Sequence, residues 1–418
     1  MLVSNPLAEM LDERIKSLDS TDPLRSFRSR FFLPKGVVYL DGNSLGALPV
    51  ATAGRLQQVV NEEWGAGLIK SWNSHDWIGA TQRVGNKIAT LIGAKPGEVT
   101  VADSTSVNIF KLLLAAISNK PGRNIILTEA GNFPTDLYIA QGISGLFPNL
   151  NLLAVPGSKI LEGINDQVAA ILLTHVHYKT GYKHNLAEIT RRAHQCGALI
   201  VWDLSHSVGA VDVNLAMAQV DLAVGCGYKY LNGGPGAPAF LFVAKHLQGQ
   251  LRSPIAGWFG HAAPFEFSDE FLPAPNISRF LSGTPPILGL LALEVGVDLL
   301  MEAPLNAVSK KSQKLTALFI DLVESYCEEF DLEIVTPKNP ELRGSHVSIK
   351  HEQGYAIVQA LIARGIVGDF RSPDIMRFGF APLYTSYEDV SRAVDILSDV
   401  MRTESWREFD TGIRDKVT

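Results

Sequence analysis

Between Gly36 and about Leu290, short apolar segments alternate with helical patterns, and this alternation most constrains how the chain can fold. One segment, Ala169–Thr174, is apolar without alternating polar residues, as expected for a strand covered on both faces. Strands that alternate with helices in this way indicate a mainly parallel sheet. The segments expected to form its strands are Val99–Val101, Asn124–Thr128, Leu152–Val155, Ala169–Thr174, Ala198–Trp202, Val220–Val224 and Ala239–Val243.

The pattern changes after Leu290, where we expect a smaller α+β domain over residues 291–418. Its predicted elements are an amphipathic helix around Leu315–Val323, a strand at Val347–Ile349, a helix ended by Gly365, two short strands, and a last helix that opens at Ser386-x-x-Asp389. Residues 1–35 are expected to form a helical arm that ends at Pro34. A chain of 418 residues thus divides into an arm, a large α/β domain over residues 36–290 and a small domain.

Composition argues against several classes of function. A net charge of −6 and a pI of about 6.0 give no sign of a nucleic-acid partner or an anionic membrane. The longest strongly apolar stretch, Ile287–Leu293, is too short to cross a bilayer, and Met1–Lys16 lacks the apolar core of a signal peptide. The 3 cysteines are odd in number and widely spaced, which argues against a disulfide framework. We therefore expect a reducing, cytoplasmic setting.

An aspartate and a glycine-flanked lysine follow two neighbouring predicted strands. Asp203 comes directly after Ala198–Trp202, and Lys229 lies in Gly225–Gly234, just after Val220–Val224. Because ligands bind at the carboxyl ends of parallel strands, both side chains are expected at one edge of the sheet. Pyridoxal 5'-phosphate (PLP) needs these two groups, an amine for the Schiff base and an acid that keeps the pyridine nitrogen protonated. Singly they suit a helix cap and a surface lysine, but together they predict a PLP enzyme.

Hydroxyl side chains follow the predicted strand Val99–Val101 in the motif Asp103-Ser104-Thr105-Ser106, and a helical pattern begins directly after them. Free backbone N–H groups at the start of a helix, together with hydroxyls, suit a phosphate group. Ordinary helix capping by serine or threonine explains the same pattern. A PLP site elsewhere in the chain favours Thr105 and Ser106 as ligands of the cofactor phosphate.

Further polar and aromatic side chains stand at predicted strand ends. Phe133 is placed to stack on the pyridine ring, with a core aromatic as the alternative, and Asp136 and Thr174 are placed to bond polar groups of the cofactor. The pair His175 and His177 lacks a third ligand, so we expect no metal site.

An arginine stands in the apolar segment Met376–Gly379 of the predicted small domain. The guanidinium of Arg377 suits the carboxylate of an amino acid, which it can hold with two hydrogen bonds. An ion pair between domains is the alternative for Arg377, and Arg371 is a competing candidate for the carboxylate.

These motifs resemble the kynureninase family of the bacterial type, fold-type I PLP enzymes in the aminotransferase class V superfamily, over nearly the whole chain. The resemblance implies a large domain with a mainly parallel sheet flanked by helices, plus a smaller α+β C-terminal domain. Asp203 and Lys229 alone mark only the superfamily, whereas Gly-Asn-Ser-Leu-Gly and Tyr-Lys-Tyr-Leu-Asn are more specific. The segments that carry the resemblance are Tyr39–Gly46, Ser104–Asn108, Asn132–Asp136, Asp203–His206, Tyr228–Gly234, Gly257–His261 and Gly283–Pro286.

The resemblance implies a homodimer, in which Trp258 and Thr284 reach the cofactor from the second subunit. It assigns Thr105, Ser106, His206 and Tyr228 to the phosphate region. Together with the residues above, the expected cofactor-binding set is Thr105, Ser106, Phe133, Asp136, Thr174, Asp203, His206, Tyr228, Lys229, Trp258 and Thr284. The residues expected to bind the substrate are Ser44, Trp72 and Arg377.

The reaction so implied is hydrolysis of L-kynurenine to anthranilate and L-alanine, a step of tryptophan catabolism and of the kynurenine pathway towards NAD biosynthesis. Lys229 would remove the α-proton. Tyr228 is the candidate for proton transfers at the γ-carbonyl and β-carbon, and binding the phosphate is its alternative role. Trp72 and Thr284 stand where family members that favour a 3-hydroxylated ring have histidine and asparagine, so 3-hydroxykynurenine is expected to be the weaker substrate.

Other functions use the same residues. A cysteine desulfurase needs a thiolate after the lysine, but the only later cysteine, Cys327, lies on an apolar helix face and is expected to be buried. An aminotransferase would use Lys229, Asp203 and Arg377 and return the amino group to a keto acid. A catalytically silent binding module is disfavoured by the intact Lys229.

Overall fold

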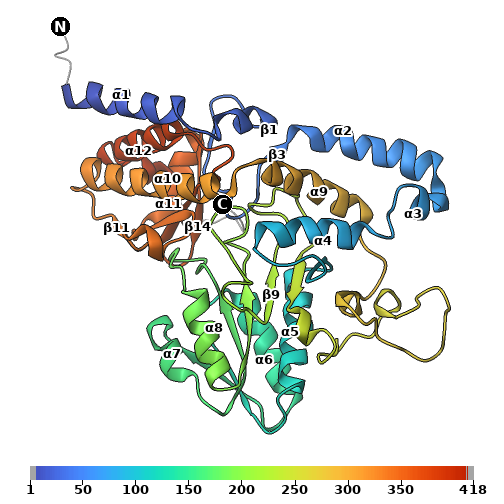
Figure 1. Ribbon diagram of the computed structural model, residues 1–418. Helices are drawn as coiled ribbons and strands as arrows, with labels where there is room; N and C mark the ends of the chain where they lie inside the picture. Colours follow the sequence, from blue (N-terminus) through green and yellow to red (C-terminus); the bar gives the residue numbers. More distant parts are fainter. Residues whose placement is uncertain (1–5, 411, 413–418) are drawn as a thin grey trace. The chain divides into compact units, whose positions relative to one another are not determined.

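The chain forms two compact units in the computed structural model, which describes residues 6–410 and 412 (Figure 1). Unit 1 comprises the described residues of Met1–Val50, Lys179–Lys183 and Glu302–Thr418. Unit 2 comprises Ala51–Tyr178 and His184–Met301. The sequence predicts boundaries after residue 35 and after residue 290, whereas the units divide after Val50 and after Met301.

The N-terminal segment belongs to unit 1 because its backbone pairs there. β2 (Val38–Tyr39) runs parallel to β13 (Ile366–Val367), and the Leu40 N–H donates to the Val367 carbonyl at 2.7 Å. The side chains of Val38 and Leu40 are buried in the core of this unit. A pairing between segments so distant in the chain leaves no local pattern, which is why the sequence predicts an earlier boundary.

The predicted arm over residues 1–35 is only partly helical. Its described part contains α1 (Pro6–Ser20) and η1 (Arg25–Arg30), and residues 1–5 lie outside the described residues. The arm ends in β1 (Phe31–Phe32), which pairs antiparallel with β3 (Leu48–Pro49). Strands of two residues are too short to show alternation, so the pattern does not reveal them.

Unit 2 is built on a 7-stranded sheet in the order β4-β10-β9-β8-β7-β5-β6. The strands from β9 to β6 in this order run parallel to their neighbours, and β10 runs antiparallel to both β9 and β4. The predicted mainly parallel α/β sheet is therefore confirmed. Its strands are β4 (Val99–Val101), β5 (Ile125–Glu129), β6 (Asn151–Val155), β7 (Val168–Thr174), β8 (Leu199–Asp203), β9 (Leu222–Gly225) and β10 (Phe240–Val243).

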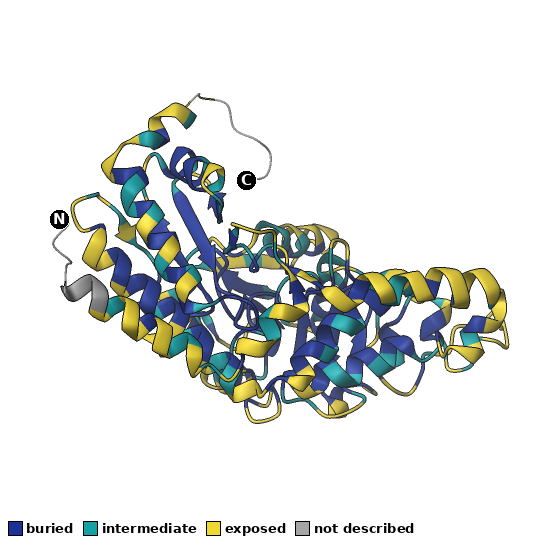
Figure 2. Cartoon of the chain, turned by 90° about the horizontal axis from the view of Figure 1, so that it is seen from above, coloured by how far each residue is buried: buried dark blue, intermediate teal, exposed yellow. Residues whose placement is uncertain are grey.

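Helices cover the sheet, and β7 is buried at every position, which explains its unbroken apolar sequence. α5 packs against β7, β8 and β9, α8 against β8, and α4 against β4. Figure 2 shows the result as dark-blue strands and helices that turn a yellow side outward. The helices of unit 2, with the last turn of α9 reaching Glu302, are α2 (Val50–Gln58), η2 (Val59–Ala66), η3 (Leu68–Lys70), α3 (Ser71–Ser74), α4 (Ala80–Leu91), α5 (Thr105–Ser118), α6 (Pro134–Leu146), η4 (Gly157–Lys159), α7 (Ile160–Gly163), α8 (Leu186–Gln195), η5 (Lys245–Leu247), η6 (Trp258–Gly260), η7 (Ile277–Phe280) and α9 (Ile287–Glu302).

Unit 1 contains a 4-stranded antiparallel sheet in the order β11-β12-β15-β14. Helices pack on it around a core that includes Leu315, Phe319 and Phe378. The predicted amphipathic helix, the strand at Val347–Ile349 and the capped last helix are all present, and Ser386 forms a capping box with Asp389. The remaining elements are α10 (Leu305–Tyr326), β11 (Glu333–Ile334), η8 (Pro340–Leu342), β12 (His346–Lys350), α11 (Gly354–Ala363), β14 (Asp369–Arg371), β15 (Ile375–Gly379), α12 (Tyr387–Arg402) and η9 (Ser405–Phe409). Among the described residues, no helix is both long and apolar enough to span a membrane.

Candidate active site

Most of the predicted cofactor residues line one cavity of about 140 Å³ in unit 2. The cavity lies where β7 and β8 end and α5 begins, so the carboxyl ends of parallel strands and a helix N-terminus meet there. Its lining residues are Ser104, Thr105, Ser106, Phe133, Thr135, Asp136, Thr174, Tyr178, Asp203, Ser205, His206, Tyr228 and Lys229.

Lys229 lies in the tight segment that connects β9 to β10. Glycine is required in this segment, since a Cβ on Gly233 would lie 2.7 Å from the carbonyl oxygen of Gly227. The Lys229 Nζ lies 2.9 Å from Nε2 of His206. It also lies 5.8 Å from the centroid of the Phe133 ring. The amine is therefore held between an imidazole and an aromatic face.

Asp203 is the last residue of β8 and lies opposite Thr174, the last residue of β7. Its Oδ1 accepts a hydrogen bond from the Ser205 N–H at 2.8 Å. Burial raises the pKa of Asp203, and the nearby Lys229 works in the opposite direction. A buried carboxylate of this kind is stabilised by a cationic partner.

A second acid, Asp136, lines the same cavity near the start of α6. Burial raises the pKa of Asp136 well above its ordinary range, and the charge of Asp203 adds to the effect. Thr174 donates to Asn132, and its Oγ1 lies 3.3 Å from Oδ2 of Asp136. Two acids and one lysine thus share this cavity, and burial raises the pKa of both acids.

The hydroxyl residues of the motif Asp103–Ser106 have two different roles. Ser104 is the N-cap of α5, where its side chain accepts from the Val107 N–H at 3.4 Å. Capping therefore explains Ser104. Thr105 and Ser106 occupy the first turn of the helix and line the cavity, where a helix N-terminus favours an anion.

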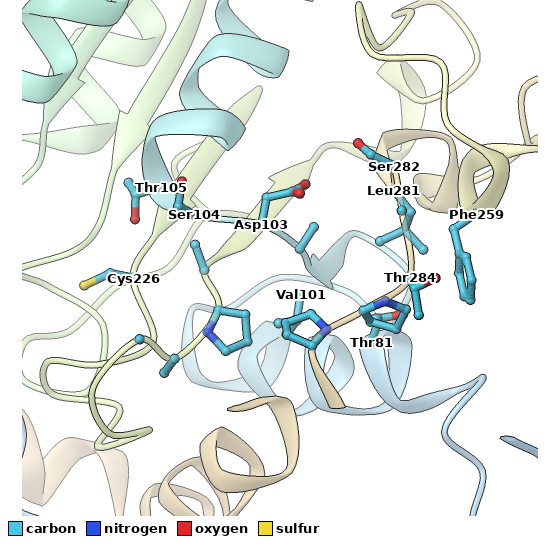
Figure 3. A pocket seen from close by; sticks show the side chains of 18 of the residues that line it. Thr81, Val101, Asp103, Ser104, Thr105, Cys226, Phe259, Leu281, Ser282 and Thr284 are labelled. Carbon is cyan, nitrogen blue, oxygen red and sulfur yellow. The ribbon is translucent and has the colours of Figure 1, made fainter. Parts of the chain in front are cut away.

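Trp258 and Thr284 lie outside the 140 Å³ cavity. Thr284 lines a second cavity of about 520 Å³ together with Thr105 and Tyr228 of the same chain. Figure 3 shows Ser104 and Thr105 on one side of this cavity and Ser282 and Thr284 on another. Trp258, in η6, is 41% exposed and packs edge-on against Phe259.

Trp72 lies in α3, and its ring meets that of Trp77 edge-on, with centroids 5.7 Å apart. With Trp64, Trp77 and Thr284 it lines a third cavity, of about 420 Å³. The structure thus brings together Trp72 and Thr284, the two residues predicted to meet the aromatic end of the substrate.

The predicted carboxylate-binding arginine lies in unit 1, on β15. The Arg377 Nε–H donates to Oδ1 of Asp369 at 2.7 Å, and its Nη2 donates to both Asp369 and Ser44. The Ser44 hydroxyl donates to Asp369 at 2.7 Å. Arg371, the competing candidate, pairs with the same carboxylate at 2.6 Å. Burial works to raise the pKa of Asp369, but Arg377, Arg371 and Ser44 together outweigh it and lower that pKa.

A further acid, Asp41, faces this group. Its backbone forms a bridge with Gly379 at the end of β15, and its Oδ1 is buried without a hydrogen-bond partner. Burial raises the pKa of Asp41 to about 7, and the charge of Asp369 contributes to the rise. The group formed by Ser44, Asp369, Arg371 and Arg377, with Asp41 beside it, is called the arginine group below.

Sequence reasoning gave no role to several residues of these sites. Asn132, Ser205 and Asp41 stand inside motifs that were singled out, so their positions were visible although their contacts were not. Asp369 and Tyr178 belong to no such motif. Asp369 is recognised as a site residue only from the register of β14 on β15, which pairs it with Arg377.

His175 and His177 have hydrogen-bond partners within the fold, and Cys327 is buried. His175 Nδ1 lies 2.8 Å from the Ser207 hydroxyl, and His177 Nε2 lies 3.0 Å from the Gly131 carbonyl. Cys327 is buried at the end of α10 in unit 1, and burial raises the pKa of its thiol to about 11. A thiol held protonated in this way is a poor nucleophile, which argues against a desulfurase.

Several known proteins are similar to this chain in sequence or in fold. A model of the kynureninase C-terminal domain matches residues 308–397. Kynureninase from Pseudomonas fluorescens is 48% identical over 409 residues, which cover 96% of this chain and 98% of the relative. Kynureninase from Burkholderia pseudomallei (strain K96243) is 48% identical over 413 residues, covering 97% and 99%. The fold resembles that of a cysteine desulfurase from Thermococcus onnurineus NA1, with a TM-score of 0.78, 18% identity, and coverage of 90% of this chain and 98% of that one.

Proposed function

The chain belongs to the kynureninase family, and from this premise we propose that it is a PLP-dependent hydrolase that cleaves the Cβ–Cγ bond of L-kynurenine to give anthranilate and L-alanine. The observation that carries the proposal is the cavity shared by Lys229 and Asp203. A lysine amine and a buried acid in one cavity are the two groups that PLP chemistry requires of a protein.

The residues of the cavity fit this cofactor. Burial raises the pKa of Asp203, and a protonated pyridine nitrogen would supply the cationic partner that the ionised carboxylate needs. Thr105 and Ser106 would bind the phosphate, with His206 and Tyr228 beside them, and Phe133 would cover the ring. Asp136 and Thr174 would bond its polar groups. When bound, PLP supplies a ring that withdraws electrons from the substrate α-carbon.

The protein's own side chains then have distinct tasks. The Lys229 amine removes the α-proton. Burial raises the pKa of the Tyr228 hydroxyl, so this group is protonated at neutral pH. We assign to it the proton transfers at the γ-carbonyl oxygen and the β-carbon. Arg377 binds the α-carboxylate with Ser44 as its neighbour, and Trp72 meets the aromatic end of the substrate.

The direct test is to incubate the protein and PLP with L-kynurenine while following anthranilate fluorescence and alanine. Asp203→Asn keeps the lysine but removes the acid, and we expect it to lower kcat about 10²–10³-fold, as for other preorganised charge contacts. Transfer of the amino group to a keto acid, or release of sulfur from L-cysteine, in place of anthranilate formation would refute the proposal in favour of the aminotransferase or the desulfurase.

We also propose a homodimer in which Trp258 and Thr284 serve the partner's cofactor. The support is an apolar surface around Trp258, where Phe265 is 60% and Phe267 75% exposed, since exposed apolar patches of this kind mark interaction sites. Mixing Lys229→Ala chains with Trp258→Leu chains should restore activity, because one heterodimer site would then have both residues intact. Full activity in a protein that sediments as a monomer would contradict the shared site.

A cytoplasmic location and a role in tryptophan catabolism, towards NAD biosynthesis, complete the proposal. The 3 cysteines are all free thiols, which suits a reducing compartment. The expected partner beyond the second subunit is the small-molecule substrate.

A further inference from the structure

A lysine is fully buried beside the hydroxyl motif. Lys111 lies on α5, and its side chain is 0% exposed. Its Nζ pairs with the carboxylate of Asp103 and donates to the carbonyl oxygen of Phe280 at 2.7 Å. Burying an ammonium costs several kcal/mol, and apolar side chains often replace buried ion pairs without loss of stability. Stability alone therefore does not account for a lysine at this position.

Asp103, the first partner of Lys111, sets the conformation of the turn before α5. Asp103 has a φ of +45°, in the left-handed region that residues other than glycine seldom adopt. Its carbonyl accepts from the Ala239 N–H at 2.8 Å, which fixes the backbone of the turn to the residue before β10. Because Ser104, Thr105 and Ser106 follow directly, the conformation of Asp103 determines where the first N–H groups of the helix point.

The second partner of Lys111, the carbonyl group of Phe280, belongs to the segment that leads to Thr284. Phe280 ends η7, and the chain continues from it through Leu281 and Ser282 to Thr284. Thr284 and Thr105 line the same 520 Å³ cavity, together with Asp103 (Figure 3). One ammonium group therefore connects the helix, the turn at its start and the loop that faces it.

We propose that Lys111 is a positioning residue for the phosphate group of the cofactor, because it fixes the turn Asp103–Ser106, which would bind the phosphate of this chain's cofactor, against the loop Phe280–Thr284, which would serve the partner's cofactor. This inference rests on the proposed binding of PLP. Lys111 itself need not touch the phosphate: it acts through the carboxylate of Asp103 and the carbonyl of Phe280.

The test compares two ligands that differ only in the phosphate. Apoprotein is titrated with PLP and with pyridoxal, and both dissociation constants are measured by absorbance. Lys111→Met should weaken PLP binding roughly tenfold to a hundredfold, the effect of losing well-aligned hydrogen bonds to a charged group. Binding of pyridoxal should change little, so the ratio of the two constants reports on the phosphate site rather than on general damage.

Unit 1 offers a matched control. Lys311 is also a buried lysine paired with an aspartate, Asp22, at 2.7 Å. Lys311→Met should lower stability while the ratio of PLP to pyridoxal affinity stays that of the wild type. If Lys111→Met does not fold, Asp103→Asn takes its place, because asparagine accepts the left-handed conformation but lacks the charge that holds Lys111.

The outcomes separate this inference from the proposed function. A wild-type protein that binds neither PLP nor pyridoxal overturns the proposed function. A wild-type protein that binds both, with an unchanged ratio in Lys111→Met or in its Asp103→Asn substitute, overturns only the positioning role. A selective loss of PLP affinity in the variant supports it.

Discussion

In unit 1 the buried carboxylate of Asp369 is paired with two arginines, Arg371 and Arg377, whereas in unit 2 the buried acids Asp136 and Asp203 share a cavity with one lysine. The pKa of Asp369 is lowered because the arginines outweigh its burial, and the pKa values of Asp136 and Asp203 are raised because burial prevails there. The two regions would therefore receive a ligand in different ways. Unit 2 would gain from a cationic ring nitrogen, while a substrate carboxylate at Arg377 would join an ion pair that is already formed.

The largest expected effect is that of Lys229→Ala, which removes the one lysine among the described residues that line the 140 Å³ cavity of unit 2. Turnover should fall roughly 10⁴-fold or more, and the long-wavelength Schiff-base absorbance should disappear, because the amine supplies both the covalent link and the base. Absorbance spectra and kinetics on the folded variant measure both. Lys159→Ala, at an exposed lysine paired with Glu162, is the control and should behave as the wild type. Near-normal turnover in Lys229→Ala would show that the amine of unit 2 has no such role.

The contrast between the acids predicts unequal losses of stability when each is replaced by asparagine. Asp369→Asn should lower the free energy of unfolding by about 3 kcal/mol, because it leaves the buried Arg377 without its counter-charge. Asp136→Asn should leave the cofactor-free protein within about 1 kcal/mol of the wild type, because ionisation of Asp136 is disfavoured in the folded state. Urea unfolding at pH 7 measures both, and equal losses would remove the contrast.

The same contrast predicts a pH dependence with a definite sign. The folded-state pKa of Asp369 lies below the unfolded value of about 3.9, so its contribution is complete above that value and is lost as the pH falls further. The deficit of Asp369→Asn should therefore shrink on acidification below about pH 4. A deficit that stays constant down to pH 2 would show that the charge of Asp369 is not its cause.

A smaller effect is expected from Asp41, an acid of unit 1 whose pKa is raised as those of Asp136 and Asp203 are. Its folded-state pKa of about 7 exceeds the unfolded value of about 3.9, so the folded state holds an extra proton and loses stability as the pH rises between these values. Between pH 5 and pH 8, Asp41→Asn should gain at least about 1.4 kcal/mol relative to the wild type, the equivalent of one pKa unit. Unfolding curves for both proteins that move in parallel between pH 5 and pH 8 would contradict the raised pKa.

The smallest effect concerns a cavity with no acid among its lining residues, the one lined by Trp64, Trp72, Trp77 and Thr284. A 3-hydroxyl group on the substrate ring would find few partners there, and an unpaired buried hydroxyl costs about 1–3 kcal/mol. We expect kcat/KM for L-kynurenine to exceed that for 3-hydroxy-L-kynurenine roughly tenfold or more. Both substrates are measured side by side on one preparation. Equal values, or a preference for the hydroxylated ring, would show that this cavity does not select the ring.

The sequence predicted the unit 2 site better than the arginine group, for a physical reason. Asp203 ends one apolar strand and Lys229 lies four residues after the end of another. In a parallel sheet the ends of neighbouring strands meet, so local pattern and connectivity were enough. The pairing of Asp369 with Arg377 depends instead on the register of two short antiparallel strands, which no periodicity specifies. The special position of Lys111 could have been predicted from the sequence, because this lysine stands on the apolar face of a predicted helix.

The antiparallel strand β10 is the last strand of the unit 2 sheet to be synthesised, yet it stands between β9 and β4. During translation, β4 therefore has no strand to pair with in this sheet until the ribosome has released Phe240–Val243. The late pairing of β10 with β4 joins two segments: the turn that follows β4 and the segment with Lys229 that precedes β10. Capture of the cofactor would then mark completed pairing of the unit 2 sheet, and a nascent chain cut before Phe240 would fail to retain it even though its lysine is already made.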